Sequence, residues 1–380
     1  MSEEMNMPRG GFRKQLLATA SALALLGSAY SARAADNDSD RPQVWIELGG
    51  QLDRLSGEPQ IFSPQFFSLA SPTNLSPLVD SQQLPPFSIG EEGKISFEPS
   101  GTDWILTAAI RYGRSHAARH LHAQTAGLDL GKIYVAGLIS ESNVLAQTKA
   151  FGDGQTILSE SHLVLDFQAG KDVGLGMFGA GGTSVVSAGI RFAQFTSGSG
   201  GTFHARPVFG ANFITKPGKY RLAEEFKATY TAVSRANRST LAIGPSVSWD
   251  ASLPVAGNPS DKTINFDWGV NAAVQFGRQR AQVHHQTTGY HYHKYGGIGG
   301  IKKTGSYTTA PPDQNRSRAI AIPNVGGFAG LSFRYPNARL SIGYRADFFF
   351  GAMDGGIDTR KSENVSFYGP FASVSVGLGG

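Results

Sequence analysis

The sequence predicts an all-β protein, a transmembrane antiparallel β-barrel of about 12 strands (range about 10–14) that follows a cleaved signal peptide. Three observations carry this prediction. Seven segments alternate strictly between apolar and polar residues, the N-terminus has the composition of an export signal, and the rest of the chain has no apolar run long enough for a membrane helix. Only helices and closed barrels satisfy their backbone in lipid, so a membrane form of this chain must be a barrel.

The alternating segments share one asymmetry. They cover residues 103–112, 160–169, 185–195, 240–250, 265–276, 324–335 and 338–350. One face of these segments comprises 39 positions without a single Asp, Glu, Lys or Arg, although 17% of the whole chain is charged. The opposite face has eleven charges. Successive side chains of a strand point to opposite faces, so the pattern predicts strands with one apolar and one polar face.

Two architectures fit such strands. In a membrane barrel the apolar face meets lipid and the polar face lines a wet interior. In a soluble secreted all-β binding protein the apolar faces of two sheets meet each other. Hydrophobic residues make up only 40% of the chain, which favours the barrel because a barrel needs one apolar face per strand and no large core. The chain has no cysteine, so disulfide bonds do not contribute to its stability.

Residues 1–34 resemble a secretory signal peptide. Arg9, Arg13 and Lys14 form a positive start, an apolar core of Leu and Ala follows, and Ala32-Arg33-Ala34 matches the small-x-small pattern before a cleavage site. The core is too short to span a membrane. We therefore expect cleavage near residue 34 and a single barrel domain over residues 35–380.

The remaining elements follow in chain order. Residues 43–54 are expected to form the first strand, and residues 55–101 a long Pro-rich irregular segment, because six prolines there interrupt any ladder. Weaker strands are expected at 130–139, 221–233 and 280–292, and the last strand at 366–378. Pro336-Asn337 is a tight turn, whereas 277–323 and 351–365 are longer connections. Short periplasmic turns and long outer loops are typical of outer-membrane barrels, although 251–264 would be a long periplasmic turn.

Charges on the polar face are the candidate site. If the interior conducts, these residues set its ion preference, since lumen substitutions tune selectivity. Two zones with few acidic residues, 173–223 and 277–323, are interpreted first as solvated loops. The alternative is a basic constriction that gives the pore a mild preference for anions. The predicted pore-lining residues are Arg111, Asp166, Arg191, Asp267, Arg345 and Asp347.

Other motifs are weaker. His116, His120 and His122 form one histidine group, and His284, His285, His291 and His293 another; loop or interface histidines are favoured over metal ligands. A G-x-G-x-x-G match at residues 174–179 leads into a strand rather than a helix. No nucleophile elbow is present, so no enzyme activity is expected. No cofactor or metal is expected either. A net charge of +5 is too small to favour nucleic acid.

The C-terminal half resembles a known family. The runs RSTLAIGP at 238–245, GLSFRY at 330–335, SIGYR at 341–345 and GPF at 369–371 are similar to the Legionella-type major outer-membrane protein family, over roughly residues 235–380. The resemblance implies a pore-forming β-barrel. The chain departs from that pattern in having Leu378 where such barrels usually have a terminal aromatic, and in lacking the cysteines of that family's better-known members.

Together these features predict a protein of the Gram-negative outer membrane, a passive water-filled pore for small solutes or ions. The expected partners are outer-membrane lipid, the barrel-assembly machinery and the transported solutes or ions, with no nucleic acid. A non-conducting structural barrel and the soluble binding protein are the alternatives.

Overall fold

The computed structural model describes residues 43–56, 66–68, 71–76, 87–124, 144–147, 151–174, 182–216, 219–258, 262–295, 302–309, 312–355 and 362–378. The predicted signal peptide lies outside these ranges and stays a prediction. Every regular element within them is a β-strand. In the same ranges, no helix has the length and apolar character needed to cross a membrane.

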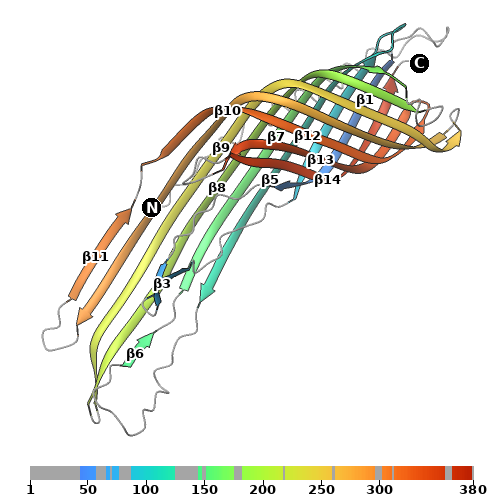
Figure 1. The fold of residues 1–380 in the computed structure, drawn as a ribbon. Coiled ribbons are helices and arrows are strands. Elements are labelled where there is room, and N and C mark those ends of the chain that lie inside the picture. The colour runs from blue at the N-terminus through green and yellow to red at the C-terminus, as the bar shows by residue number, and fades with distance from the viewer. Residues whose placement is uncertain are drawn as a thin grey trace. The chain divides into compact units, whose positions relative to one another are not determined.

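Ten strands close into one antiparallel ring (Figure 1). The first and last strands pair with each other, from Val44 opposite Leu378 to Ser56 opposite Ser366, and this ladder closes the ring. The ring strands are β1 (Gln43–Ser56), β4 (Phe87–Glu98), β5 (Trp104–Gln124), β7 (Phe151–Asp172), β8 (Thr183–Lys216), β9 (Lys219–Asn258), β10 (Lys262–Tyr295), β12 (Gln314–Tyr335), β13 (Ala338–Asp354) and β14 (Ser362–Leu378). A closed barrel, and not a two-sheet sandwich, is therefore the fold.

Four short strands lie outside the ring. β6 (Val144–Gln147) pairs with β8, and β11 (Lys302–Thr309) pairs with β10. β2 (Phe66–Ser68) and β3 (Ser71–Ser76) pair with each other as a separate two-stranded sheet. All four belong to connections between ring strands.

The ring has ten strands where about 12 were expected, and the difference has a physical origin. Segments 221–233 and 240–250 belong to one 40-residue strand, β9, and segments 265–276 and 280–292 belong to the 34-residue strand β10. Segment 87–98, expected to be irregular, forms the ring strand β4. The expected strand at 130–139 lies outside the described residues. Strands much longer than a membrane crossing were thus counted twice, and a strand next to prolines was missed.

The turns at the two ends of the ring differ. At the end that includes Val44 and Leu378, the connections are 99–103, 173–182, 259–261 and 336–337. At the other end they include the long stretches 57–86, 125–150 and 296–313. The expected turn at 251–264 is mostly strand, because β9 continues to Asn258 and β10 begins at Lys262. This shortening removes the long turn expected at 251–264, and 173–182 is the longest connection at this end.

The two faces of the ring have inverted polarity relative to a soluble protein. None of the 39 positions of the charge-free face is buried; all are exposed or half-exposed on the outside of the ring. Phe167 is 59% exposed, Val270 50% and Ile342 46%. Polar and charged side chains fill the inside, including Asp347, which is fully buried, and Gln275. The predicted separation of the faces is confirmed, with the polar face inward.

Candidate functional site

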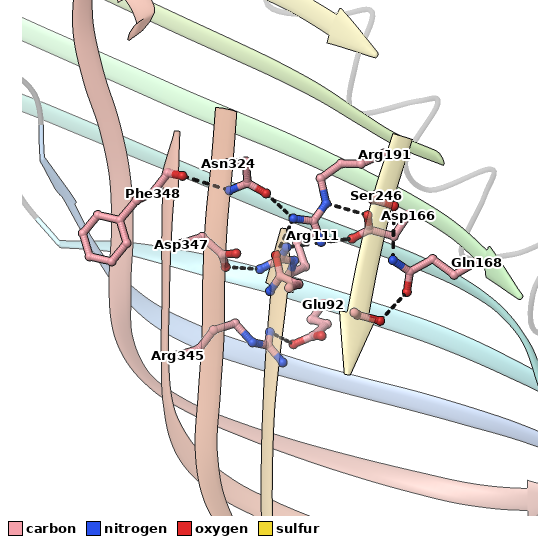
Figure 2. A network of polar contacts seen from close by, with 12 residues as sticks. Glu92, Arg111, Asp166, Gln168, Arg191, Ser246, Asn324, Arg345, Asp347 and Phe348 are labelled. Atoms are coloured by element: carbon pink, nitrogen blue, oxygen red, sulfur yellow. Dashed lines mark hydrogen bonds and ion pairs between the residues drawn. The ribbon is translucent and has the colours of Figure 1, made fainter. Parts of the chain in front are cut away.

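The interior of the ring is the candidate site. All six predicted residues lie on strands of the ring and are at least half-buried inside it. Five of them, Arg111, Asp166, Arg191, Arg345 and Asp347, come together in one layer of ion pairs and hydrogen bonds (Figure 2). Asp267 belongs to a separate cluster nearer the short-turn end.

Arg111 connects opposite sides of this layer. Its guanidinium on β5 forms an ion pair with Asp347 on β13, and Nη2 lies 3.9 Å from Asp166 Oδ2. Along the ring, β4, β1 and β14 stand between β5 and β13. The pair therefore reaches across the lumen, and Figure 2 shows the two side chains meeting there.

Arg191 makes the second set of contacts. Its Nε donates to Asp166 Oδ1 at 2.6 Å and its Nη2 to Asp166 Oδ2 at 3.0 Å, a bidentate pair. Its Nη1 donates to Asn271 Oδ1 at 2.6 Å and also to the side-chain oxygen of Asn324. The Asn324 amide in turn donates to the carbonyl of Phe348 at 3.0 Å. One arginine on β8 thus holds β7, β10 and β12 together.

Arg345 completes the layer. It pairs with Glu92 on β4, and its guanidinium lies 4.8 Å from the ring centroid of Phe371 and 5.7 Å from that of Phe328. Beside the layer, Gln168 Nε2 donates to Ser246 Oγ at 3.2 Å. A cation stacked on aromatic faces and paired with a carboxylate is stabilised from both sides.

The charges of these ion pairs balance. Three guanidiniums, of Arg111, Arg191 and Arg345, face three carboxylates. The carboxylates are those of Glu92, Asp166 and Asp347. Buried charges are tolerable only when they are paired and hydrogen-bonded. Each of these six charges is paired, although Asp347 Oδ1 has no hydrogen-bond partner. Balanced pairs give no basis for the mild anion preference considered from the sequence.

Asp267 lies in the second cluster. Its Oδ2 accepts a hydrogen bond from Arg339 Nη2 at 2.5 Å, and its Oδ1 accepts one from Ser252 Oγ at 2.6 Å. Arg334 Nη2 is 3.4 Å from Oδ1. Two arginines thus contact one aspartate in this cluster.

An apolar layer lies next to the ion-pair layer, on the side of the long connections. Phe195 and Phe367 have their ring centroids 6.5 Å apart, although β8 and β14 are diametrically opposite in the ring of ten. Phe349 packs edge-on against Phe195 at 4.8 Å and stacks on Phe367 at 5.4 Å. The buried His162 ring stacks on Phe367 at 4.3 Å. Side chains from opposite walls therefore meet across the lumen.

A third polar layer follows beyond the phenylalanines. Arg238 Nη1 donates to Glu363 Oε2 at 2.8 Å and to the Asp354 carbonyl at 3.0 Å. Arg316 Nη2 forms an ion pair with Asp354 at 2.8 Å. A cavity with about 350 Å³ of empty space, open solvent included, lies between Phe195, Arg238 and Glu363. The lumen is thus polar at both ends of the apolar layer.

Several of these residues escaped the sequence reasoning. Glu92 falls inside the stretch that was expected to be irregular. Asn324 and Asn271 are uncharged, so a search for charges on the polar face passes over them. Phe349 carried a usable signal, because it is a large aromatic on the otherwise polar face of segment 338–350.

Comparisons with known proteins add little. No protein-family model and no curated protein matches the chain. Among solved structures, a mutant of the TodX monoaromatic hydrocarbon channel is similar at 9% identity over 91% of both chains, with a TM-score of 0.20. The CymD monoaromatic hydrocarbon channel is 8% identical over 90% of this chain and 89% of that one, with a TM-score of 0.20. The transport unit of the autotransporter AIDA-I from Escherichia coli is 7% identical over 94% and 97%, with a TM-score of 0.18. Such low scores carry no argument, so function is argued from the chain's own contacts.

Proposed function

We propose that this protein is a bacterial outer-membrane β-barrel that rests with its lumen closed and passes small ions or solutes only when the contacts across the lumen separate. The observation that carries the membrane part is the exposed apolar band around the ring. A soluble protein of this size would bury such a surface, since contiguous exposed apolar patches beyond a few hundred Å² mark contact sites.

The band on β10 has the height of a membrane. Its outward positions between the charged residues Lys262 and Arg278 are all uncharged, from Ile264 to Phe276. Twelve residues at about 3.3 Å each extend about 40 Å along the strand. With the strand tilt of about 40° that is typical of these barrels, the band is about 30 Å tall, close to the hydrocarbon thickness of a bilayer.

Outward charges lie at the edges of the band. Arg278 and Arg280 follow it on β10, and Arg114 follows it on β5. Glu91 on β4 is exposed and pairs in register with Tyr112, two residues from Arg114, so it too lies at the long-connection edge. Charges cost little near the interface and about 2–4 kcal/mol, for Arg or Lys, at the midplane. Their placement is therefore the one expected of a lipid-facing surface.

The turn lengths support one orientation. Outer-membrane barrels have short periplasmic turns and longer extracellular loops. On this basis the end with the turns at 99–103 and 336–337 faces the periplasm, and the long ends of β8, β9 and β10 extend outside the cell. The predicted export signal is consistent with this location.

The resting state is argued from the size and filling of the ring. Barrels of about eight strands have interiors filled by side chains, whereas 16–18 strands leave an aqueous channel. Ten strands lie near the filled end of this range, and both the Arg111–Asp347 pair and the phenylalanine layer reach across the lumen. A passive, permanently open pore would need these contacts to be absent.

A second candidate, a non-conducting structural barrel, is favoured by one specific observation. The cluster of Phe195, Phe349 and Phe367 is buried and apolar, and its rings meet from opposite walls of the lumen. An ion passing between these rings would lose part of its hydration, which is costly. If the cluster does not move, the barrel does not conduct.

Planar-bilayer recording separates the two candidates. Wild-type protein should show rare, brief openings, and the pair Arg111→Ala with Asp347→Ala should open more often, because removing both charges keeps the net charge of the layer unchanged while widening it. Arg280→Ala with Asp313→Ala is the matched control, since both residues are exposed outside the lumen. Silence from both proteins would leave the structural barrel, and a large steady wild-type conductance would contradict a closed resting state.

A further inference from the structure

A cluster of three histidines and one aspartate lies on the outward face of three neighbouring strands, beyond the apolar band. His120 and His122 are on β5, Asp153 is on β7 and His204 is on β8. The ladder places His122 opposite Asp153, and Asp153 opposite His204. His120 and His122 are two residues apart on one strand, so they share a face. Only the two β5 histidines could be grouped from the sequence.

Two of the histidines converge on one carboxylate oxygen. His120 Nε2 lies 2.7 Å from Asp153 Oδ1, and His122 Nδ1 lies 3.5 Å from the same atom. The side chains are 60%, 54% and 39% exposed for His120, His122 and Asp153. Exposed side chains change rotamer at low cost, so this grouping can adjust to a ligand.

The His204 ring contacts Thr231 on the neighbouring strand β9. Its Nδ1 lies 3.1 Å from Thr231 Oγ1. In the tautomer in which Nδ1–H donates to the threonine hydroxyl, Nε2 keeps a free lone pair. Metal-binding histidines almost always donate their second ring N–H to such a neighbour, which fixes the tautomer and the ring orientation.

One of the two distances between these side chains matches a tetrahedral zinc site. Ligand atoms about 2.0–2.2 Å from Zn²⁺ are about 3.4 Å from each other in a tetrahedron. The separation of 3.5 Å between His122 and Asp153 already meets this, whereas the 2.7 Å between His120 and Asp153 is a hydrogen bond that must lengthen. Across the described residues no group of three or more His, Cys, Asp or Glu side chains is arranged to hold a metal ion, so the site would have to form by rotation of exposed rings.

We propose that His120, His122, Asp153 and His204 bind one Zn²⁺ ion on the surface of the β5–β7–β8 sheet, with Thr231 as a positioning residue. Imidazole nitrogen and carboxylate oxygen are ligands that Zn²⁺ favours, and four of them close a tetrahedral site. The ion would tie three strands together beyond the apolar band. The proposal is independent of conduction and of membrane insertion.

The test is a titration of untagged, detergent-purified full-length protein with ZnCl₂. Binding is measured by isothermal titration calorimetry and, independently, by competition with a chromogenic zinc chelator. Wild type should bind one equivalent. His122→Ala and Asp153→Asn should each weaken binding at least about tenfold, since loss of even an outer partner typically costs 10–100-fold. Thr231→Val should have a smaller effect in the same direction.

His116→Ala is the matched control, because His116 is outward on the same strand but opposite Ser159, away from the cluster. It should bind zinc as wild type does. Heat-modifiable migration of each variant, unchanged from wild type, shows that the barrel is intact. No binding by wild type would overturn the proposal, and so would equal binding by the His122 and Asp153 variants, which would place any zinc elsewhere on the chain.

Discussion

At the scale of single residues, the interior depends on paired charges. Asp347 is fully buried and takes part in an ion pair with Arg111. Its placement follows from parity alone, because it is an odd-numbered residue on β13, whose even-numbered residues face outward as far as Phe350. Which partner it meets does not follow from parity, since that depends on the register of every ladder between β5 and β13, four by way of β4, β1 and β14 and six the other way around the ring.

Removing one partner of this pair should destabilise the barrel. Asp347→Asn removes the nearer carboxylate of the buried Arg111 and leaves only Asp166 at 3.9 Å, and breaking a buried pair typically costs about 3–5 kcal/mol. Urea unfolding in detergent, followed by tryptophan fluorescence, would show the lower free energy of unfolding. Asp313→Asn is the control, because Asp313 pairs with His284 at an exposed position and should change stability by less than about 1 kcal/mol. Equal effects of the two variants would show that the buried pair contributes nothing special.

The backbones of β8 and β7 come so close at Gly189 that this position should tolerate no side chain. A Cβ added at Gly189 would lie 1.9 Å from the carbonyl oxygen of Phe167 on β7, far inside van der Waals contact. Gly189→Ala should therefore reduce the yield of folded, heat-modifiable barrel. Gly200→Ala on the same strand should not, because its nearest neighbour would be an ordinary 3.6 Å away. Normal assembly of the Gly189 variant would mean that the two strands can separate at this point.

At the scale of the elements, the sequence is informative about faces and less so about strand length. All seven alternating segments form ring strands with the charge-free face outward. Period-2 alternation is strong in these segments because an outer face in contact with lipid would have to be apolar. Beyond the band this constraint ends, so the sequence pattern there predicts the remaining parts of β9 and β10 as separate, weaker strands. β4 was missed because it directly follows Pro85 and Pro86, and because Glu91 interrupts its apolar face.

Substitutions along one strand should depend on height. Val270 is midway along the band on β10, so Val270→Arg should cost about 2–4 kcal/mol and impair assembly. Gln282→Arg, on the same face of the same strand but beyond Arg278 and Arg280, should assemble normally. Heat-modifiable migration of the two purified variants is the measurement. Impaired assembly of both, or of neither, would argue against a lipid-facing band.

The far ends of the longest strands should be dispensable for closure of the ring. β8 and β9 pair within the ring up to Ala205 opposite Tyr230, and then continue together to Lys216 opposite Lys219. Replacing residues 207–227 with an Asn-Gly turn, which favours tight hairpins, should leave a folded and heat-modifiable barrel. Loss of folding would show that this hairpin helps the ring to form.

At the scale of the whole molecule, closure of the ring and of the lumen are separate properties. The ring closes through the backbone ladder of β1 and β14. Sequence patterns predict that a closed ring forms, but they do not predict how many strands it has. The lumen closes through side chains that meet only once ten strands fix its width. The polar face predicts a pore because alternation shows which side chains point inward. It does not show whether those side chains extend far enough to meet across the lumen.

The central claim is that the apolar band faces lipid. The chain has no cysteine, so single-cysteine variants can be spin-labelled without background. In liposomes, electron paramagnetic resonance at Val270 and Ile342 should show high accessibility to oxygen and low accessibility to an aqueous nickel chelate, with the reverse at Gln282. Equal exposure of all three labels to the nickel chelate would contradict a lipid-facing band and, with it, the membrane-spanning barrel.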